Sequence, residues 1–381
     1  MARPEHGGNL AWAAAVAGCP PAAILDFSAS ISPLGPPKSA LAAIQEGLGS
    51  LTAYPDPNYG ELRAALSEAL KVDPDWILPG NGSAELLTWA ARDLSELDGT
   101  YLVTPAFGDY FRSLKAFGAQ VLECPLDLEM LRSQLGSGAG NSVTDGLHVS
   151  HRSPFSGVCS LPVPSSSGSV NRGLLLNNPH NPAGLLFGKE TILPFVGQLG
   201  LVVVDEAFMD FLPPETGESL ISAVSEFPNL VILRSLTKFY SLPGLRLGCA
   251  IAHPDLLRRW QLWRDPWPVN ALAAAAAVAV LRDAAFDRQT WDWLPEARRE
   301  LFEGLAELPG LRPFPGAANF LLVESAVSVA QLQKSLLEEH RILIRDCLSF
   351  PQLGDRFFRV AVRESADNLR LIAAIKEVSS Q

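Results

Sequence analysis

The segment around Lys238 places one amine among groups that could hold a phosphate. Ser235 stands three residues before this lysine, and Arg246 follows eight residues after it, beyond a Pro-Gly turn. A lysine that forms a Schiff base with a cofactor aldehyde requires such neighbours, because hydroxyl and guanidinium groups can hold the cofactor's phosphate while the amine stays near its carbonyl carbon. The spacing therefore predicts a covalent cofactor site at Lys238. A surface lysine is the alternative for this segment taken alone.

An acidic residue ends an apolar run further upstream. Leu201–Val204 is a predicted strand, and Asp205 follows it directly. Ligands of parallel α/β sheets collect at the carboxyl ends of the strands. If the cofactor is a pyridine, a carboxylate at its ring nitrogen keeps that nitrogen protonated and strengthens the ring as an electron sink. The alternative role for Asp205 is to cap the next turn.

Two further loops follow predicted strands. Asn177–Gly184 contains two Asn-Pro steps, which favour a stiff loop that can aim Asn181 at a ring oxygen. Gly80–Glu85 leads into a predicted helix, and glycines at a helix N-terminus expose N–H groups to a phosphate. An ordinary turn and an ordinary N-cap are the alternatives for these two loops.

These loops require a sheet to position them, and the order of the elements predicts one. Short continuous apolar runs alternate with helical patterns, which is typical of a mostly parallel sheet covered on both faces. The predicted strands of this sheet are 76–78, 101–103, 120–124, 174–176, 201–204 and 230–233. The predicted helices between and beyond them are 61–70, 84–94, 267–281, 329–339 and 368–378. Two later runs, 319–324 and 357–362, alternate as strands do and predict an α+β layer.

The chain length suits one large and one smaller domain. We expect an irregular N-terminal arm over 1–35, which joins the small domain within a segment 1–40. The large domain is expected over 41–270, and a bridging helix with the small C-terminal domain over 271–381. Residues 136–172 are rich in Gly, Ser and Pro, and they predict a surface insertion, with a functional lid as the alternative.

Composition limits the partners and the compartment. The chain has 381 residues, 48% hydrophobic and 19% charged, so a substantial core is expected. The net charge of −11 argues against nucleic acid or an anionic membrane as a partner. Five scattered cysteines predict reduced thiols and no metal site, and the N-terminus lacks the apolar region of a signal peptide. A cytoplasmic protein is therefore expected.

Taken together, the motifs GNGS, NPHNPAG, DEAF, SLTK and RLG resemble those of fold type I pyridoxal-phosphate enzymes in the class I/II aminotransferase superfamily. The resemblance covers nearly the whole chain and implies an α/β fold with a seven-stranded sheet, pyridoxal 5'-phosphate as cofactor, and a homodimer. It implies that Lys238 binds the cofactor covalently, that Asp205 pairs with the pyridinium nitrogen and that Asn181 binds the ring oxygen. The other implied cofactor contacts are Phe107 on the ring, and Gly82, Ser83, Ser235, Arg246 and the neighbouring subunit's Tyr54 at the phosphate. Phe208 replaces a tyrosine often found in this superfamily, so Asn181 has less help at the ring oxygen.

Two branches of the superfamily compete. The strings around Arg345 and Arg359 resemble both histidinol-phosphate aminotransferases and the threonine-phosphate decarboxylases of cobalamin synthesis. Arginine suits either a phosphate or a carboxylate because its planar fork pairs with both. Arg363 is interpreted as an ordinary surface arginine instead.

The N-terminal residues favour the decarboxylase branch. His6 and Gly7 stand in an HGGN string that resembles the arm which folds over the substrate phosphate in that branch, and an imidazole beside backbone amides suits an anion. Ser30 replaces an asparagine that often contacts the substrate there. The alternative for His6 is a disordered terminal residue.

The resemblance thus implies decarboxylation of L-threonine O-3-phosphate, a small phosphorylated amino acid, to (R)-1-aminopropan-2-ol O-2-phosphate for the nucleotide-loop linker of cobalamin. The competing function is transamination of histidinol phosphate with glutamate or 2-oxoglutarate. A third class, the cofactor-binding domain of a transcription regulator, is disfavoured by the acidic composition and the lack of a basic helix-turn-helix module.

Overall fold

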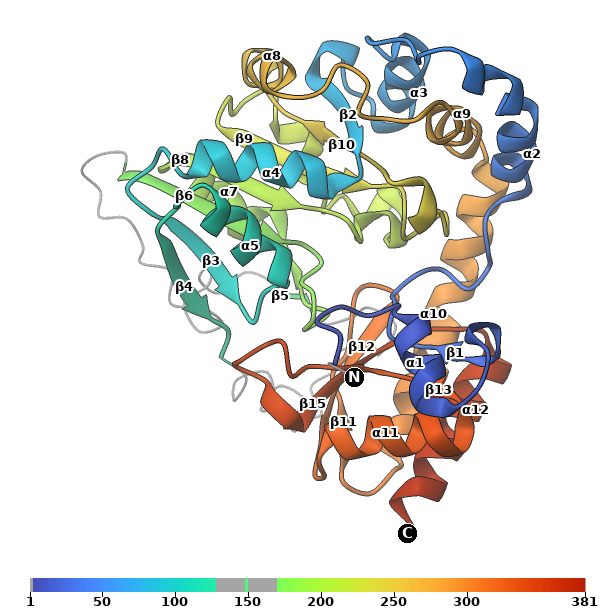
Figure 1. Cartoon of the computed structure of the whole chain (residues 1–381). Helices are drawn as coiled ribbons and strands as arrows, with labels where there is room; N and C mark the ends of the chain where they lie inside the picture. The colour runs from blue at the N-terminus through green and yellow to red at the C-terminus, as the bar shows by residue number, and fades with distance from the viewer. Residues whose placement is uncertain (1–2, 128–147, 150–169, 381) are drawn as a thin grey trace.

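The computed structural model describes residues 3–127, 148–149 and 170–380 of the chain. Figure 1 shows two bodies, a larger one built around an extended sheet and a smaller one below it that holds the C-terminus. The N-terminus lies near the boundary between them, and the long helix α10 (Ala284–Ala306) runs from the larger body down into the smaller one.

The larger body contains the predicted seven-stranded sheet. Its strand order is β2-β10-β9-β8-β6-β3-β4, and every neighbouring pair is parallel except the two that involve β10. The strands are β2 (Ile77–Asn81), β3 (Thr100–Thr104), β4 (Val121–Pro125), β6 (Val170–Asn177), β8 (Leu199–Asp205), β9 (Leu230–Ser235) and β10 (Leu247–Ile251). The α/β fold predicted from the sequence is therefore confirmed.

Both faces of this sheet are buried, which explains why its strands are continuous apolar runs. Successive strand residues enter two different core clusters, with Val202 and Val204 in one and Leu201 and Val203 in the other. One face is covered by α4 (Ser83–Leu94), α5 (Gly108–Ala116) and α8 (Pro254–Trp263). The opposite face is covered by α3 (Gly60–Leu70), α7 (Lys189–Val196) and α9 (Ala271–Val280), with α2 (Lys38–Gly47) packed on α9.

The smaller body has an antiparallel sheet of order β11-β12-β15-β14. Its strands are β11 (Leu311–Pro313), β12 (Phe320–Ser325), β14 (Arg345–Asp346) and β15 (Phe357–Ala361). Helices α11 (Val329–His340) and α12 (Ser365–Ser379) pack on each other, and α10 packs on α12. A short parallel pair joins β1 (Leu25–Asp26) to β13 (Ile342–Leu343), so the N-terminal segment lies against this body.

The N-terminal segment is not wholly irregular, in contrast to the prediction. Residues Leu10–Ala17 form helix α1, which packs on α11. The side chain of Asn9 caps its first turn, and Gly18 ends it with a φ of 62°. The alanine-rich sequence of this helix has no polar face, so it gave no amphipathic signal.

Two more expectations differ from the structure. The helix expected over 267–281 begins only at Ala271, because Pro268 precedes it and the Asn270 side chain accepts from the Ala273 N–H as an N-cap. Helix α10 was not predicted at all. The domain limits stay a prediction, although α9 packs on α2 and α3 of the larger body.

The predicted insertion at 136–172 lies almost entirely outside the described residues. Its last residues, 170–172, belong to strand β6 and not to a loop. Residues His148–Val149 form β5, which pairs in parallel with β7 (Leu186–Phe187).

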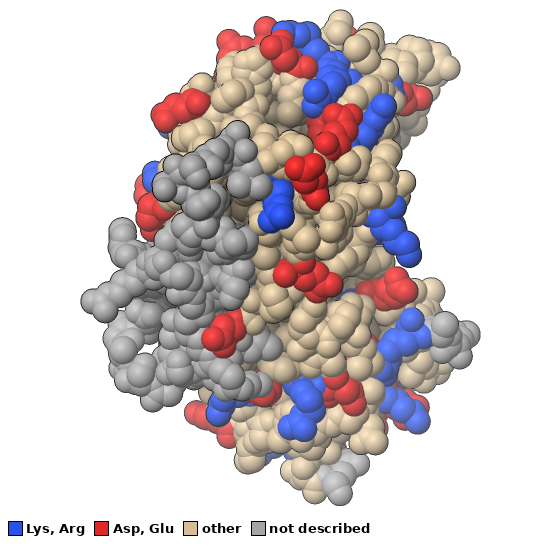
Figure 2. Space-filling view, turned by 90° about the vertical axis from the view of Figure 1, so that its left-hand side faces the viewer, with Lys and Arg blue, Asp and Glu red and all other residues tan. Residues whose placement is uncertain are grey.

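Charges of both signs are interspersed on the face of the molecule that Figure 2 shows. Figure 2 shows Lys and Arg side chains mixed with Asp and Glu side chains over the described part of one face, with no broad area of positive charge there. Among the described residues, no helix is both long enough and apolar enough to cross a membrane.

Candidate functional site

A cavity lies where the carboxyl ends of β3, β6, β8 and β9 meet the N-terminal segment and the smaller body. It brings together most of the residues predicted from the sequence, although they come from widely separated segments. The predicted residues that line it are His6, Gly7, Ser30, Ser83, Phe107, Asn181, Asp205, Ser235, Lys238, Arg246, Arg345 and Arg359. Their roles stay predictions. These residues meet at one cavity only because the fold brings their separate segments together.

Two predicted residues do not line this cavity. Gly82 lies next to it with a φ of 75°, a conformation that favours glycine, and a Cβ atom there would come within 2.6 Å of Arg246 Nη2. Tyr54 is 79% exposed and stacks on Trp267 at a ring distance of 4.4 Å. Arg363 also lies outside the cavity, paired with Asp367 at 2.8 Å.

Lys238 occupies the turn that follows β9. Its carbonyl oxygen accepts from the Ser32 N–H at 3.0 Å, and Ser241 Oγ donates to the Ser32 carbonyl at 2.6 Å, so the N-terminal segment fastens this turn. Burial lowers the pKa of Lys238 to about 8, and the nearby Arg359 and Arg246 act in the same direction. The amine is therefore poised to lose its proton near neutral pH.

Asp205 is held at the end of β8 by several donors. The Tyr110 hydroxyl donates to Asp205 Oδ2 at 2.8 Å, and the Ala207 N–H donates to Oδ1 at 3.0 Å. Asn177 Nδ2 donates to the backbone carbonyl of Asp205 at 2.7 Å. Burial raises the pKa of Asp205, while the two donors and Lys238 lower it. The carboxylate is thus fixed in one orientation at the base of the cavity.

Arg359 reaches the cavity from β15 of the smaller body. Its Nη1 donates to Asn181 Oδ1, and its Nη2 donates to the Ser28 carbonyl at 3.0 Å. Because Oδ1 of Asn181 is occupied, its side-chain NH2 is the group left for a ligand oxygen. Burial lowers the pKa of Arg359 to about 10, with Arg345 contributing. Arg359 therefore stays charged at neutral pH and favours an anionic ligand.

The N-terminal segment forms one wall beside the second arginine. Arg345 Nη2 donates to the Glu5 carbonyl and to Ser349 Oγ. The rings of His6 and Phe107 lie 5.5 Å apart. A Cβ on Gly7 would come within 2.3 Å of the Ser28 carbonyl oxygen, so this close approach requires glycine.

Several groups that could bind a phosphate line the same cavity as Lys238. Ser83 and Ala84 line the cavity at the N-terminus of α4, where free N–H groups and the helix dipole favour an anion. Ser235 Oγ and Thr237 Oγ1 lie 2.7 Å apart, and Arg246 completes the group. Among the described residues, no group of His, Cys, Asp and Glu is arranged to hold a metal ion. The cavity thus suits a phosphorylated organic ligand.

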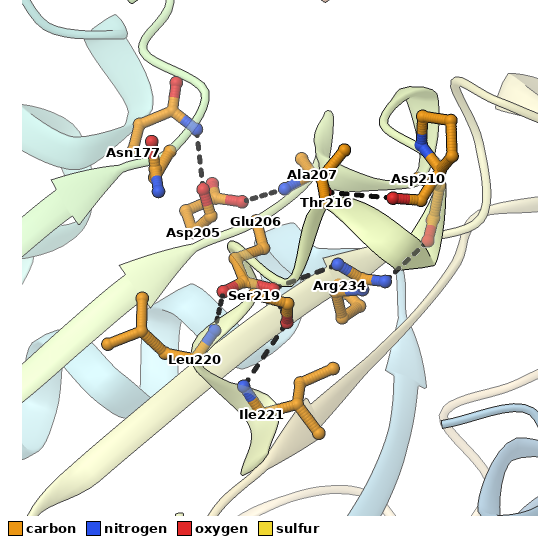
Figure 3. A network of polar contacts seen from close by, with 12 residues as sticks. Asn177, Asp205, Glu206, Ala207, Asp210, Thr216, Ser219, Leu220, Ile221 and Arg234 are labelled. Carbon is orange, nitrogen blue, oxygen red and sulfur yellow. Dashed lines mark hydrogen bonds and ion pairs between the residues drawn. The ribbon is translucent and has the colours of Figure 1, made fainter. Parts of the chain in front are cut away.

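A buried ion-pair network lies beside Asp205, as Figure 3 shows. Arg234 donates to Glu206 Oε2 at 2.9 Å and to Asp210 Oδ1 at 2.6 Å. Glu206 also accepts from Ser219 Oγ at 2.7 Å and from the Leu220 N–H at 2.8 Å. The network ties β9, which leads to Lys238, to the turn that follows Asp205.

Sequence reasoning missed several residues of the cavity. Thr237 stands inside the SLTK motif without an assigned role, and Tyr110, Asn177 and Ser28 were also left unassigned. The Thr next to Lys238 is the one whose position could have been inferred, because it stands two residues from Ser235 in a loop already interpreted as a phosphate site. The contact between Tyr110 and Asp205 spans 95 positions and has no local signal.

The chain is similar to known proteins over most of its length. It is 38% identical to a threonine-phosphate decarboxylase from Salmonella typhimurium, over 98% of this chain and 96% of the relative. A histidinol-phosphate aminotransferase structure from Clostridium acetobutylicum matches with a TM-score of 0.77 and 28% identity, over 94% of this chain and 99% of that one. A histidinol-phosphate aminotransferase from Sinorhizobium meliloti, solved in complex with pyridoxal-5'-phosphate, matches with a TM-score of 0.77 and 23% identity, over 97% and 94%. Residues 22–375 match the family model for aminotransferase class I and II, and the chain therefore belongs to the class I and II aminotransferase family, with the fold type I architecture.

Proposed function

We propose that this protein is a pyridoxal 5'-phosphate-dependent decarboxylase that converts L-threonine O-3-phosphate to (R)-1-aminopropan-2-ol O-2-phosphate. The observation that carries the proposal is the joint placement of His6, Gly7, Arg345 and Arg359 on the cavity that contains Lys238. The identity of 38% to a threonine-phosphate decarboxylase supports the same substrate.

The residues of the cavity fit this cofactor. Lys238 supplies an amine with a lowered pKa, and Asp205 supplies the buried carboxylate that a protonated ring nitrogen requires. The N-terminus of α4 with Ser235, Thr237 and Arg246 suits the phosphate, and the side-chain NH2 of Asn181 suits the ring hydroxyl oxygen. When bound, the cofactor accepts the electron pair that the departing CO2 leaves at the substrate Cα.

The other groups suit a substrate that carries two anionic ends. Arg359 and Arg345 enter from the smaller body, and either can bind a phosphate or a carboxylate through its planar fork. Ser30 lines the cavity with a buried hydroxyl that has no hydrogen-bond partner among the described residues, so it can donate to a substrate oxygen. In this proposal Lys238 returns a proton to Cα after the carboxylate has left. This reaction consumes no second substrate.

The first test compares products. We expect the purified protein with pyridoxal phosphate to release CO2 from threonine phosphate and to form aminopropanol phosphate without any 2-oxo acid. Unphosphorylated threonine should react at least about tenfold more slowly, because a charge-assisted contact to the phosphate is lost. Isotope-labelled CO2 and mass spectrometry of the product measure both outcomes. If 2-oxoglutarate is required and glutamate appears, the protein is an aminotransferase and the proposal is wrong.

A second test uses the pKa of Lys238. The amine attacks the cofactor aldehyde only when it is unprotonated, and its pKa is lowered from 10.5 to about 8. We expect the rate at which the apo protein captures pyridoxal phosphate to rise as the pH increases through about 8 and then to level off. Stopped-flow absorbance measures this rate. A rate that keeps rising to the pKa of an ordinary lysine would contradict the lowered value.

We also infer a homodimer in which Tyr54 of one subunit reaches the cofactor phosphate of the other. Tyr54 is 79% exposed and lies outside the cavity of its own chain, as this role requires. It stacks on Trp267, which is itself 40% exposed, so the pair offers an aromatic surface to a second copy.

A further inference from the structure

The buried carboxylate of Asp205 has a dedicated partner on a different element. Tyr110 lies in α5, 95 positions before Asp205, and its hydroxyl donates to Asp205 Oδ2 at 2.8 Å. Tyr110 is 3% exposed, and its ring packs edge-on against Phe107 at 5.8 Å. The helix and the aromatic contact therefore fix the position of this hydroxyl relative to the end of β8.

The Tyr110 hydroxyl is a permanent donor. Burial raises its pKa well above the ordinary value, and the charge of Asp205 and the hydrogen bond to it act in the same direction, as does the charge of Asp109. The hydroxyl therefore keeps its proton at neutral and moderately alkaline pH. Its single proton is directed at Asp205 Oδ2, so the hydroxyl stabilises the ionised carboxylate over the neutral acid.

Asp205 needs this help because it is buried. Desolvation favours its neutral form, and the groups that oppose desolvation are the Tyr110 hydroxyl, the Ala207 N–H and the charge of Lys238. The charge of Lys238 is a conditional contribution, since this amine has a pKa of about 8 and is the group that bonds to the cofactor. Among these groups Tyr110 is therefore the side chain whose contribution does not depend on the state of the lysine.

We propose that Tyr110 is a positioning residue that keeps Asp205 ionised and oriented toward a cationic ring nitrogen of the bound cofactor. The inference rests on the proposed binding of pyridoxal phosphate. Tyr110 acts through Asp205 and not on the reacting atoms. Its hydroxyl occupies Oδ2 and the Ala207 N–H occupies Oδ1, so the carboxylate cannot rotate without breaking both bonds.

The test measures cofactor binding to the apo form of Tyr110→Phe as a function of pH. Without the hydroxyl the pKa of Asp205 rises further, so the carboxyl becomes neutral at a higher pH than in the wild type. We expect the dissociation constant for pyridoxal phosphate to rise roughly tenfold at acidic pH, because one hydrogen bond to the ionised carboxylate is lost. The dissociation constant of the variant, divided by that of the wild type, should fall toward one as the pH increases, because Asp205 then ionises in both proteins. Fluorescence titration provides the constants.

Two comparisons separate positioning from a general loss of packing. In an Asp205→Asn background, Tyr110→Phe should have no further effect on binding, because the carboxylate that it supports is gone. Tyr101→Phe removes another tyrosine hydroxyl, one that contacts Arg172 away from the cavity, and should bind the cofactor as the wild type does. A Tyr110→Phe deficit that is independent of pH, or that persists with Asp205→Asn, would overturn the inference. A wild-type protein that binds no pyridoxal phosphate would instead overturn the proposed function.

Discussion

Lys238→Ala should abolish the visible absorbance of the lysine-bound cofactor and lower the decarboxylation rate at least about 10³-fold. The reason is that the proposed function gives one amine two tasks, the covalent attachment of the cofactor and the transfer of a proton to Cα. Loss of a positioned acid–base group alone costs about 10²–10⁴-fold. The variant should still bind pyridoxal phosphate without a covalent bond, because Ser235, Thr237 and Arg246 remain. Absorbance spectra before and after borohydride reduction, together with the rate of CO2 release, measure these effects.

The matched control is a lysine on the surface. Lys334 is exposed on α11 and pairs loosely with Glu338 at 3.8 Å, so Lys334→Ala should keep both the absorbance and the rate. If Lys238→Ala retains the absorbance band and if borohydride still fixes the cofactor to the chain, another lysine carries the bond. The assignment of the cavity around Lys238 would then be wrong.

The strands and the core of the large sheet were predictable because buried strands appear in the sequence as apolar runs. A central strand such as β8 is covered on both faces, so it reads as an unbroken apolar run, and its end is marked by Asp205. The loops that follow such strands must meet at one edge of the sheet. Residues of four separate motifs could therefore be assigned to one site before their positions were known.

Helix α10 could not be predicted because its buried residues do not form a regular apolar pattern. It contains Pro295 in its interior, and its buried stripe includes the polar side chains Thr290 and Arg298. Arg298 is accommodated because its guanidinium donates to the Ala317 carbonyl at 2.9 Å, a partner that the sequence pattern does not reveal. The helical repeat of apolar residues is thus interrupted at the polar positions, which are buried because tertiary contacts satisfy them.

The supporting residues around Asp205 were equally hidden. Tyr110 stands three residues after Phe107, which was assigned to the ring, and its contact with Asp205 depends on how α5 packs against the sheet. Arg234 stands four residues before Lys238, but its side chain does not line the cavity. It contacts Glu206 and Asp210 instead. Motifs identify groups that touch a ligand. The residues that hold those groups depend on the folded structure.

Arg234→Met should lower the free energy of unfolding by about 3–5 kcal/mol, because the change leaves the buried Glu206 carboxylate without its counter-charge. Glu206 is fully buried and Arg234 is 8% exposed, so water cannot replace the lost ion pair. Burial raises the pKa of Glu206 and of Asp210, and Arg234 is the charge that lowers both. Urea denaturation followed by fluorescence measures the loss.

The pH dependence and two companion variants test the cause of that loss. Arg234 lowers the pKa of Glu206, so the folded variant takes up a proton at a higher pH than the folded wild type does. The deficit of the variant should therefore be larger at about pH 7.5 than at about pH 5. Glu206→Gln added to Arg234→Met should recover part of the stability, because one unpaired buried charge is removed. Arg299→Met removes an exposed arginine of α10 that pairs with Glu296 and Glu303, and it should leave the unfolding midpoint nearly unchanged. Equal stability of Arg234→Met and the wild type would mean that the network does not hold the turn after Asp205 against β9, and the position of Asp205 would need another explanation.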